Sequence, residues 1–142
     1  MTSAINSLLA GVVLVGASAA LLVHDPVPAD EVSTICQPGY ARSQRIGPAD
    51  YYPIARAAYD RAGIPWSERG GYRLDHRVPL CLGGTWDRSN LEIQTIADAA
   101  EKDRLEWRAC ERVCRGQLSI GTARGWFRDW RAAYRQQFGV KP

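Results

Sequence analysis

The four cysteines of this 142-residue chain restrict its fold more than any other feature of the sequence. All of them, Cys36, Cys81, Cys110 and Cys114, lie downstream of an apolar segment without charged residues at positions 4–23. An even number of cysteines in an exported chain is typical of two disulfides. Cys110 and Cys114 stand one helical turn apart in a predicted helix, where a bond between them is geometrically awkward. Each is therefore expected to pin that helix to another part of the chain.

Two crossed pairings satisfy this expectation. We predict Cys36 with Cys114 and Cys81 with Cys110, and the opposite crossing stays open at the level of sequence. A zinc site is the weaker alternative, because the sequence has no CxxC pair and His76 is the only histidine beyond the apolar segment and its margin. These residues do not make a tetrahedral ligand set with a familiar spacing.

The apolar segment at residues 4–23 is about as long as a helix that crosses a bilayer. A cleavable signal peptide is favoured by small residues at 17–19 and 27–29, and opposed by the lack of Lys or Arg before the segment. An uncleaved anchor, which would contact the membrane through an apolar helix, fits the length equally well. Both predict an exported domain, either periplasmic, secreted or anchored outside the cytoplasm. We therefore divide the chain into a leader or anchor with linker at 1–30 and one folded domain at 31–142.

The predicted domain is basic. The only charged residues before position 31 are Asp25 and Asp30, so the net charge rises from +3 for the whole chain to +5 for the domain. Nucleic acid, anionic lipid and an acidic wall polymer are all compatible partners. Charge of this size is also common in ordinary soluble domains and does not choose among them.

Periodicity and turn residues predict an α+β domain, with two strands and a following helix at its centre. Flanking helices complete the domain. The predicted elements are a linker at 24–48, a helix capped by Asp50 and ending near Gly63, a loop at 66–72, strands at 72–80 and 90–94, a helix at 96–115 and a last helix from about 119 or 122 to 138.

The predicted hairpin carries side chains suited to phosphodiester hydrolysis. His76 has an imidazole that can act as a general base near neutral pH, and the carboxylate of Asp75 suits a hard divalent cation. Neighbouring strand residues point to opposite faces unless the strand ends or twists there, which Pro79 favours. Asn90, across the hairpin, is expected to hold the histidine ring or the loop backbone.

Two glycines, Gly83 and Gly84, lie in the return between the strands. We interpret both as residues that supply positive φ. A phosphate-binding loop is a poorer interpretation, because the lysine and the helix start of a P-loop are missing.

The stretch "LDHRVPLCLGGTWDRSNLEIQ" at 74–94 as a whole resembles the first two motifs of the HNH endonuclease family, in which a "DH..P...GG......NL" hairpin precedes a helix. More loosely, the chain is similar to small exported HNH-like proteins. Their "C.PGY...R", "KD..E", "VC.G.L" and "W...Y" pieces correspond to "CQPGYARSQR", "KDRLE", "VCRGQL" and "DWRAAY" here. The resemblance spans most of residues 36–134.

The resemblance implies a ββα-metal core that hydrolyses DNA or RNA with a divalent metal and little sequence specificity. Mg²⁺ is expected, with Mn²⁺ or Zn²⁺ as alternatives. By the same resemblance His76 is the general base, Asp75 a metal ligand and Asn90 the orienting residue. The His or Asn that HNH enzymes place early on the helix is absent, and Asp98 is the substitute we predict. Further candidate site residues are Lys102, Asp103 and Glu106, although Lys102 with Glu106 can also be an exposed helix pair.

The last predicted helix carries arginines at intervals of four, three and four residues, which aligns them in one stripe. Such a stripe can follow a phosphate backbone, or it can be a solvated helix face. Trp126 and Trp130 are expected in the core rather than against bases. The stripe consists of Arg124, Arg128, Arg131 and Arg135.

Two other functions remain open at the level of sequence. A non-catalytic exported domain could keep the HNH-like hairpin as a scaffold after losing a ligand. An anchored envelope protein could bind an acidic polymer through its arginines. No small-molecule cofactor is expected, and the sequence leaves the oligomeric state open.

Overall fold

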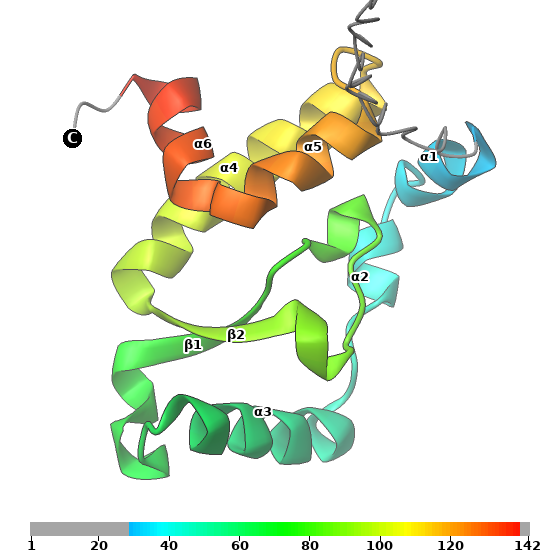
Figure 1. The fold of residues 1–142 in the computed structure, drawn as a ribbon. Coiled ribbons are helices and arrows are strands. Elements are labelled where there is room, and N and C mark those ends of the chain that lie inside the picture. The colour runs from blue at the N-terminus through cyan, green and yellow to red at the C-terminus, as the bar shows by residue number, and fades with distance from the viewer. Residues whose placement is uncertain (1–28, 140–142) are drawn as a thin grey trace, which may run out of the picture.

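The computed structural model describes residues 29–139, and the fold is α+β as predicted. A two-stranded antiparallel sheet lies between α3 on one side and the helices α4, α5 and α6 on the other (Figure 1). The elements are α1 Ala29–Ile35, α2 Tyr40–Ser43, α3 Pro48–Ala62, η1 Trp66–Gly71, β1 Tyr72–His76, η2 Leu80–Leu82, η3 Arg88–Asn90, β2 Leu91–Thr95, α4 Ile96–Cys114, α5 Ile120–Trp126, η4 Phe127–Asp129 and α6 Trp130–Phe138.

The predicted apolar helix at 4–23 lies outside the described residues. Between residues 29 and 139, no helix combines the length and the apolar character that crossing a membrane requires.

The hairpin and the helix after it follow the predicted order. Tyr72 pairs with Thr95 and His76 pairs with Leu91, so β1 ends opposite the start of β2. The side chain of Thr95 then caps α4 by accepting a hydrogen bond from the amide of Asp98, at 3.1 Å. The continuous helix predicted for 96–115 is thereby confirmed, with Gly116 in the left-handed region directly after it.

Three predictions for the part of the chain before β1 are wrong. The predicted linker contains the short helices α1 and α2, and the predicted loop before β1 is the 3-10 helix η1. The helix α3 begins at Pro48 after Gly47, so Asp50 lies inside its first turn instead of capping it. Proline suits this position because its fixed φ fits the helix. A backbone N–H in the first turn would have no partner within the helix, so its absence costs nothing. Tertiary contacts account for α1, whose last residue Ile35 is buried in the core.

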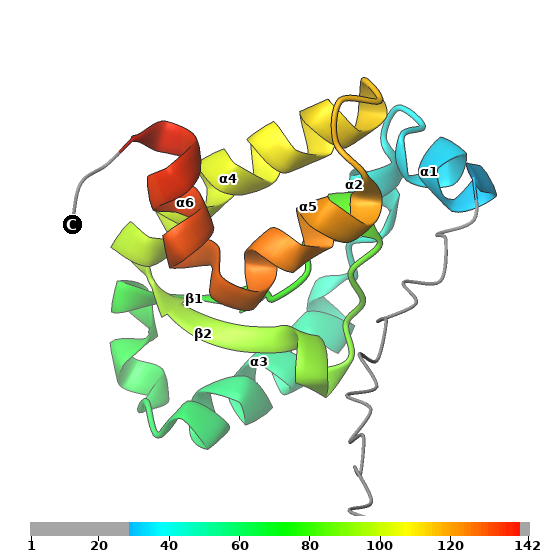
Figure 2. The ribbon, with the colours of Figure 1, turned by 45° about the horizontal axis from the view of Figure 1, so that its top comes forward.

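The last predicted helix is broken in the middle. A 3-10 turn, η4, separates α5 from α6, and both pack against α4 (Figure 2). The carboxylate of Asp129 accepts a hydrogen bond from the amide of Ala132 at 3.0 Å and so starts a new helix. A short acidic side chain favours such a cap over the helix interior, and this preference divides the helix. Trp130 is buried as predicted, and Trp126 is partly buried against the same core.

Both disulfides have the predicted pairing. Cys36 is bonded to Cys114 and Cys81 to Cys110, with Cα atoms 5.4 and 6.0 Å apart. They tie the end of α1 and the turn η2 to α4. Their presence fits an oxidising compartment outside the cytoplasm.

Buried side chains form two separate clusters. The hairpin core lies between α3 and the sheet and consists of Ala55, Ala58, Leu74 and Leu91. The larger one, which we call the stapled core because both disulfides pack against it, lies around α4, α5 and α6. The stapled core consists of Ile35, Leu82, Leu105, Ala109, Val113, Ile120, Ala123, Phe127, Trp130, Ala133 and Tyr134.

Candidate functional site

Three carboxylates meet where the hairpin faces α4. Asp75 comes from β1, and Asp103 and Glu106 come from α4 on adjacent turns. One oxygen from each lies within 4.8 Å of the others. All three residues line an open cavity of about 670 Å³, together with His76. Among the described residues this is the one set of acidic, histidine or cysteine side chains with a metal-binding spacing.

Lys102 lies within this carboxylate group. Its ammonium donates hydrogen bonds to Asp75 Oδ2 at 3.2 Å, to the backbone oxygen of His76 at 2.6 Å, and to Glu106 Oε1. The side chain is 0% exposed, so the interpretation of Lys102 and Glu106 as an exposed helix pair is wrong. The sequence did contain a signal, because Lys102 falls on the buried stripe of α4 between Ala99 and Leu105.

Arg73 closes the group from the solvent side and was missed by the sequence analysis. Its two terminal nitrogens donate to the two oxygens of Asp103, at 2.9 and 2.6 Å, and one of them lies 3.6 Å from Asp75. The hydrogen bond to Asp103 raises the pKa of the Arg73 guanidinium. Arg73 stands two residues before Asp75 on a strand, so the two share a face, and this spacing was the overlooked signal.

Glu106 has a strongly shifted titration. Burial raises its pKa to about 7, against the opposing effect of the Lys102 ammonium, while the Asp75 charge raises it further. Glu106 therefore exchanges its proton near neutral pH. Perturbed carboxyl groups of this kind, lining an open cavity, are characteristic of functional sites.

His76 faces the same cavity, and its Nε2 atom is buried without a hydrogen-bond partner among the described residues. Burial lowers the pKa of the imidazole and Lys102 lowers it further, against the raising effect of Asp75. The ring packs edge-on against Trp86, with 4.4 Å between centroids. Asp75 Oδ1 accepts the backbone N–H of His76 at 2.8 Å. The end of β1 thus places both side chains at one cavity, as the twist predicted near Pro79 allows.

Asn90 holds the loop backbone and not the histidine ring. Its amide oxygen accepts from the N–H of Val78 at 2.8 Å, and its amide nitrogen donates to the carbonyls of Val78 and Thr85 at 3.0 and 2.9 Å. The sequence left open whether Asn90 holds the histidine ring or the loop backbone, and the structure shows contact with the loop backbone. The polypeptide that follows His76 is clamped to the start of β2 by one side chain.

Glycine is required at Gly83 and at Gly84, in the return between the strands, for two different reasons. Gly83 has the predicted positive φ, at 78°. Gly84 does not, and the expectation for it is wrong. A Cβ atom on Gly84 would lie 1.8 Å from the carbonyl oxygen of Val78, so a side chain has no room where the loop closes.

Asp98 is not part of the carboxylate group. Its side chain accepts a hydrogen bond from Arg131 at 2.8 Å, and its amide caps α4 against Thr95. The ligand substitution that we predicted for Asp98 is therefore not what the geometry favours. The helix carboxylates that lie beside Asp75 are those of Asp103 and Glu106, one and two turns further along α4.

The predicted arginine stripe is also not continuous, because the helix breaks between Arg124 and Arg131. Arg124 donates to the backbone oxygen of Leu82 at 2.9 Å and pairs with Glu31. Arg131 pairs with Asp98. Contact with nucleic acid stays a prediction for the exposed Arg128 and Arg135.

Comparison with known proteins adds no further constraint. No family model, no curated protein and no solved structure matches this chain. The function has to be argued from the geometry of the site and from the resemblance described above.

Proposed function

We propose that this protein is a metal-dependent nuclease with an HNH-like hairpin, which hydrolyses DNA or RNA with little sequence specificity. One observation carries the proposal. His76, whose buried Nε2 has no hydrogen-bond partner among the described residues, lines an open cavity together with three carboxylates whose oxygens lie within 4.8 Å of one another. A base and a cation-binding group are the two components that hydrolysis of a phosphodiester needs.

His76 acts as the general base. Because its pKa is lowered from the ordinary value of 6.5, the imidazole is neutral at pH 7 and Nε2 can accept a proton from a water molecule. Trp86 fixes the ring from one side, and Asn90 fixes the backbone that follows it. This support limits the motion of the base without using the proton-accepting nitrogen.

The donor set fits a hard divalent cation. Asp75, Asp103 and Glu106 offer only carboxylate oxygens, which suit Mg²⁺ or Mn²⁺ better than Zn²⁺. A bound cation would supply charge neutralisation at the phosphate during attack. Asp75 and Glu106 already pair with Lys102, and Asp103 pairs with Arg73, so the affinity without substrate should be modest. Substrate phosphate oxygens and water are expected to complete the ligand set, as is common for Mg²⁺.

A second candidate function is supported by Lys102. Its ammonium already satisfies Asp75 and Glu106, so the group can be a structural network in a non-catalytic binding domain. That alternative predicts no divalent metal binding. It also predicts that loss of His76 leaves every function intact.

The test uses the full chain with oxidised disulfides in mild detergent. Plasmid DNA and a long RNA are incubated with it in Mg²⁺, Mn²⁺, Zn²⁺ or EDTA. We expect metal-dependent degradation into many fragments, which falls by about 10²- to 10⁴-fold in His76→Ala. Added imidazole should partly restore cleavage to His76→Ala, because a free base can occupy the vacated cavity. A Tyr52→Ala variant on the exposed face of α3 serves as the control and should keep full activity.

A measurement without substrate separates the two candidates. Mn²⁺ titration, followed by calorimetry, should show weak binding to the wild-type chain and none to Asp103→Asn combined with Glu106→Gln. A folded chain that binds no metal and cleaves neither substrate would favour the non-catalytic scaffold.

A further inference from the structure

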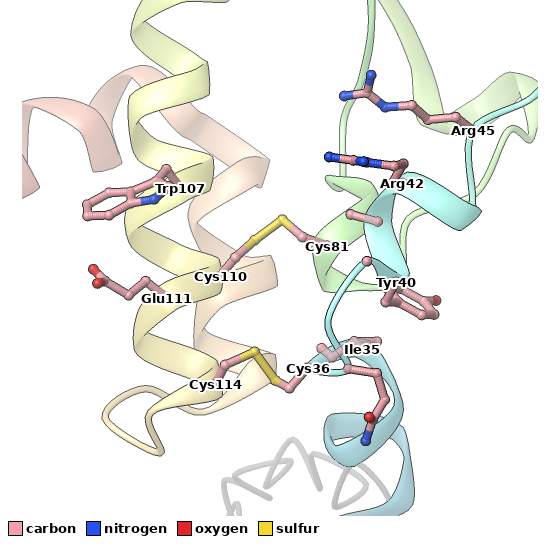
Figure 3. A pocket seen from close by; sticks show the side chains of 13 residues that line it. Ile35, Cys36, Tyr40, Arg42, Arg45, Cys81, Trp107, Cys110, Glu111 and Cys114 are labelled. Carbon is pink, nitrogen blue, oxygen red and sulfur yellow. A yellow bond between two sulfur atoms is a disulfide. The ribbon is translucent and has the colours of Figure 1, made fainter.

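A second groove extends from the candidate site along α4. It has a volume of about 550 Å³, and it lies between α4 and the segment that contains the end of α1 and the helix α2 (Figure 3). Cys36–Cys114 crosses from one wall to the other, and Cys81–Cys110, which also lines the groove, ties η2 to α4. The groove and the carboxylate cavity share lining residues, among them Arg45, Cys81 and Trp107, so the two are continuous.

One wall presents two unused cations. Arg42 and Arg45 are exposed, and their side chains extend toward α4. In the part of the chain that the structure describes, neither guanidinium has a hydrogen-bond or ion-pair partner, whereas Arg73, Arg124 and Arg131 are all paired. Two neighbouring guanidiniums without protein partners are suited to phosphate oxygens.

The opposite rim carries an unusually exposed aromatic ring. Trp107 is 67% exposed and lies on the outer side of α4 in Figure 3, next to Glu106 in the sequence. Across residues 29–139 its indole has no aromatic or cationic stacking partner, unlike Trp66, Trp86, Trp126 and Trp130. An exposed indole on one wall of a groove and two guanidiniums without protein partners on the other are the two kinds of side chain that bind single-stranded nucleic acid, with bases stacked on rings and phosphates on arginines.

The acidic residue of the groove does not oppose this charge. Glu111 pairs with Arg115 at 2.8 Å, so its carboxylate is already neutralised. Cys36–Cys114 ties the two walls together, which limits changes in the width of the groove when a ligand enters. A preformed site of this kind loses little conformational entropy on binding.

We propose that this groove binds single-stranded polynucleotide and leads it into the carboxylate cavity. Phosphates of the strand contact Arg42 and Arg45, and an unpaired base stacks on Trp107. A single strand is favoured over a duplex because the faces of paired bases are covered by their neighbours, whereas an unpaired base can offer its face to the indole. The inference rests on the proposed nuclease function for the fate of the strand, but binding itself does not depend on cleavage.

The test measures binding in EDTA, so that no cleavage occurs. The full chain, with oxidised disulfides and in mild detergent, is titrated into a fluorescein-labelled oligothymidylate, and anisotropy is followed at several salt concentrations. Arg42→Gln with Arg45→Gln should lower the slope of log affinity against log salt by about 1.4, since each phosphate contact on a single strand contributes about 0.7. Trp107→Ala should weaken binding by about 5- to 150-fold, the range for one stacked base, and Trp107→Phe should restore part of it.

Matched controls lie on α3 at residues that line neither cavity. Arg56→Gln with Arg61→Gln removes the same charge, and Tyr52→Ala removes an exposed ring. Both should keep the wild-type affinity and salt slope. A blunt-ended duplex of the same length should bind more weakly than the single strand.

Three results would overturn the inference. The first is equal weakening by the groove and α3 arginine variants, which indicates diffuse charge attraction. The second is no binding of the oligonucleotide by the wild-type chain. The third is inorganic polyphosphate that competes as well as the oligonucleotide, with Trp107→Ala unaffected, which indicates a general polyanion site. If the groove variants behave as expected but no metal supports plasmid or RNA cleavage, the groove stands and the nuclease proposal fails.

Discussion

The two cores of this protein are held together in different ways. The stapled core has both disulfides and a long apolar contact between α4 and the broken pair α5 and α6. The hairpin core is small, and among the described residues no disulfide packs against it. Aromatic contacts such as Tyr59 with Trp66 and Tyr51 with Trp86 support it instead. The candidate site lies between the two, with one carboxylate from the hairpin and two from α4.

The contrast explains why a lysine is buried at this boundary. The strands themselves are not covalently tied to α4, although Cys81–Cys110 anchors the turn that follows β1. Lys102 reaches from α4 to Asp75 and to the backbone oxygen of His76, and so joins the two parts through hydrogen bonds. The stapled core supplies a rigid frame, and the polar residues at the boundary position the side chains of the candidate site.

Among the changes that test this contrast between the two cores, removal of the disulfides should have the largest effect on the free energy of unfolding. In the loop-entropy model, loss of Cys36–Cys114 with its separation of 78 residues costs about 4.5 kcal/mol, and loss of Cys81–Cys110 with its separation of 29 costs about 3.6 kcal/mol. Paired Cys→Ser variants and urea denaturation test this order. Although Cys81–Cys110 is the less stabilising bond, its loss should reduce cleavage more, because Cys81 lines both cavities. Equal activity of the two variants would argue that the boundary is set without the disulfides.

Replacement of Lys102 by methionine removes the hydrogen bonds that join α4 to the hairpin at this boundary. Two partly buried carboxylates, Asp75 and Glu106, then lose their common partner, and we expect a loss of about 3 to 5 kcal/mol in the free energy of unfolding. Combining Lys102→Met with Glu106→Gln should recover part of this loss, because one uncompensated charge is removed. Denaturation curves of the single and double variants measure the recovery, and additive losses would contradict the network.

Asn90→Ala should have a smaller effect, confined to the hairpin. The N–H of Val78 and the carbonyls of Val78 and Thr85 lose their partner, for a cost of about 1 to 3 kcal/mol. Cleavage should fall with it, since the backbone after His76 is released. Asn90→Asp keeps the acceptor but loses both donors, and should lie between the wild type and Asn90→Ala in both measurements. Hydrogen exchange should show the loosening in β1 and not in the second half of α4.

The smallest effect per step of the experiment is a pH dependence, spread over more than two pH units, that belongs to the boundary alone. The pKa of Glu106 is raised from 4.5 in the unfolded chain to about 7 in the fold, so the fold favours its protonated form. Its contribution to stability is therefore complete below pH 4.5 and is lost as the pH rises to about 7, by at most about 1.4 kcal/mol per pH unit. Glu106→Gln should remove this slope from urea denaturation measured between pH 4.5 and 7.5. Glu101→Gln, on the exposed face of α4, should leave it in place.

Several features could be derived from local sequence because local physics decides them. The α+β class, the two strands and the uninterrupted helix α4 follow from the period of the apolar residues and from the positions of Gly63, Gly116 and Gly139. For the disulfides, the awkwardness of a bond within one helical turn left two crossed pairings, and the fold selected the one that we had favoured. His76 and Asp75 were identified as site residues from their chemistry, and they do line one cavity.

Other features depended on contacts between residues far apart in the chain. Asp98 was the expected helix ligand, but Arg131, 33 residues later, pairs with it, while Asp103 and Glu106 reach Asp75 across the boundary. The sequence was compatible with an exposed Lys102. In the structure Lys102 is buried, because β1 brings the Asp75 carboxylate and the backbone oxygen of His76 to its ammonium.

The sequence by itself therefore determined the α+β class, the hairpin with the helix after it, and the chemical groups available for a site. Only the tertiary structure decided which groups meet, which are neutralised by a partner, and which, like Nε2 of His76, have no hydrogen-bond partner among residues 29–139. The physical reason is that periodicity and capping act over a few residues. Burial, ion pairing and pKa shifts depend on neighbours that the folded chain brings together.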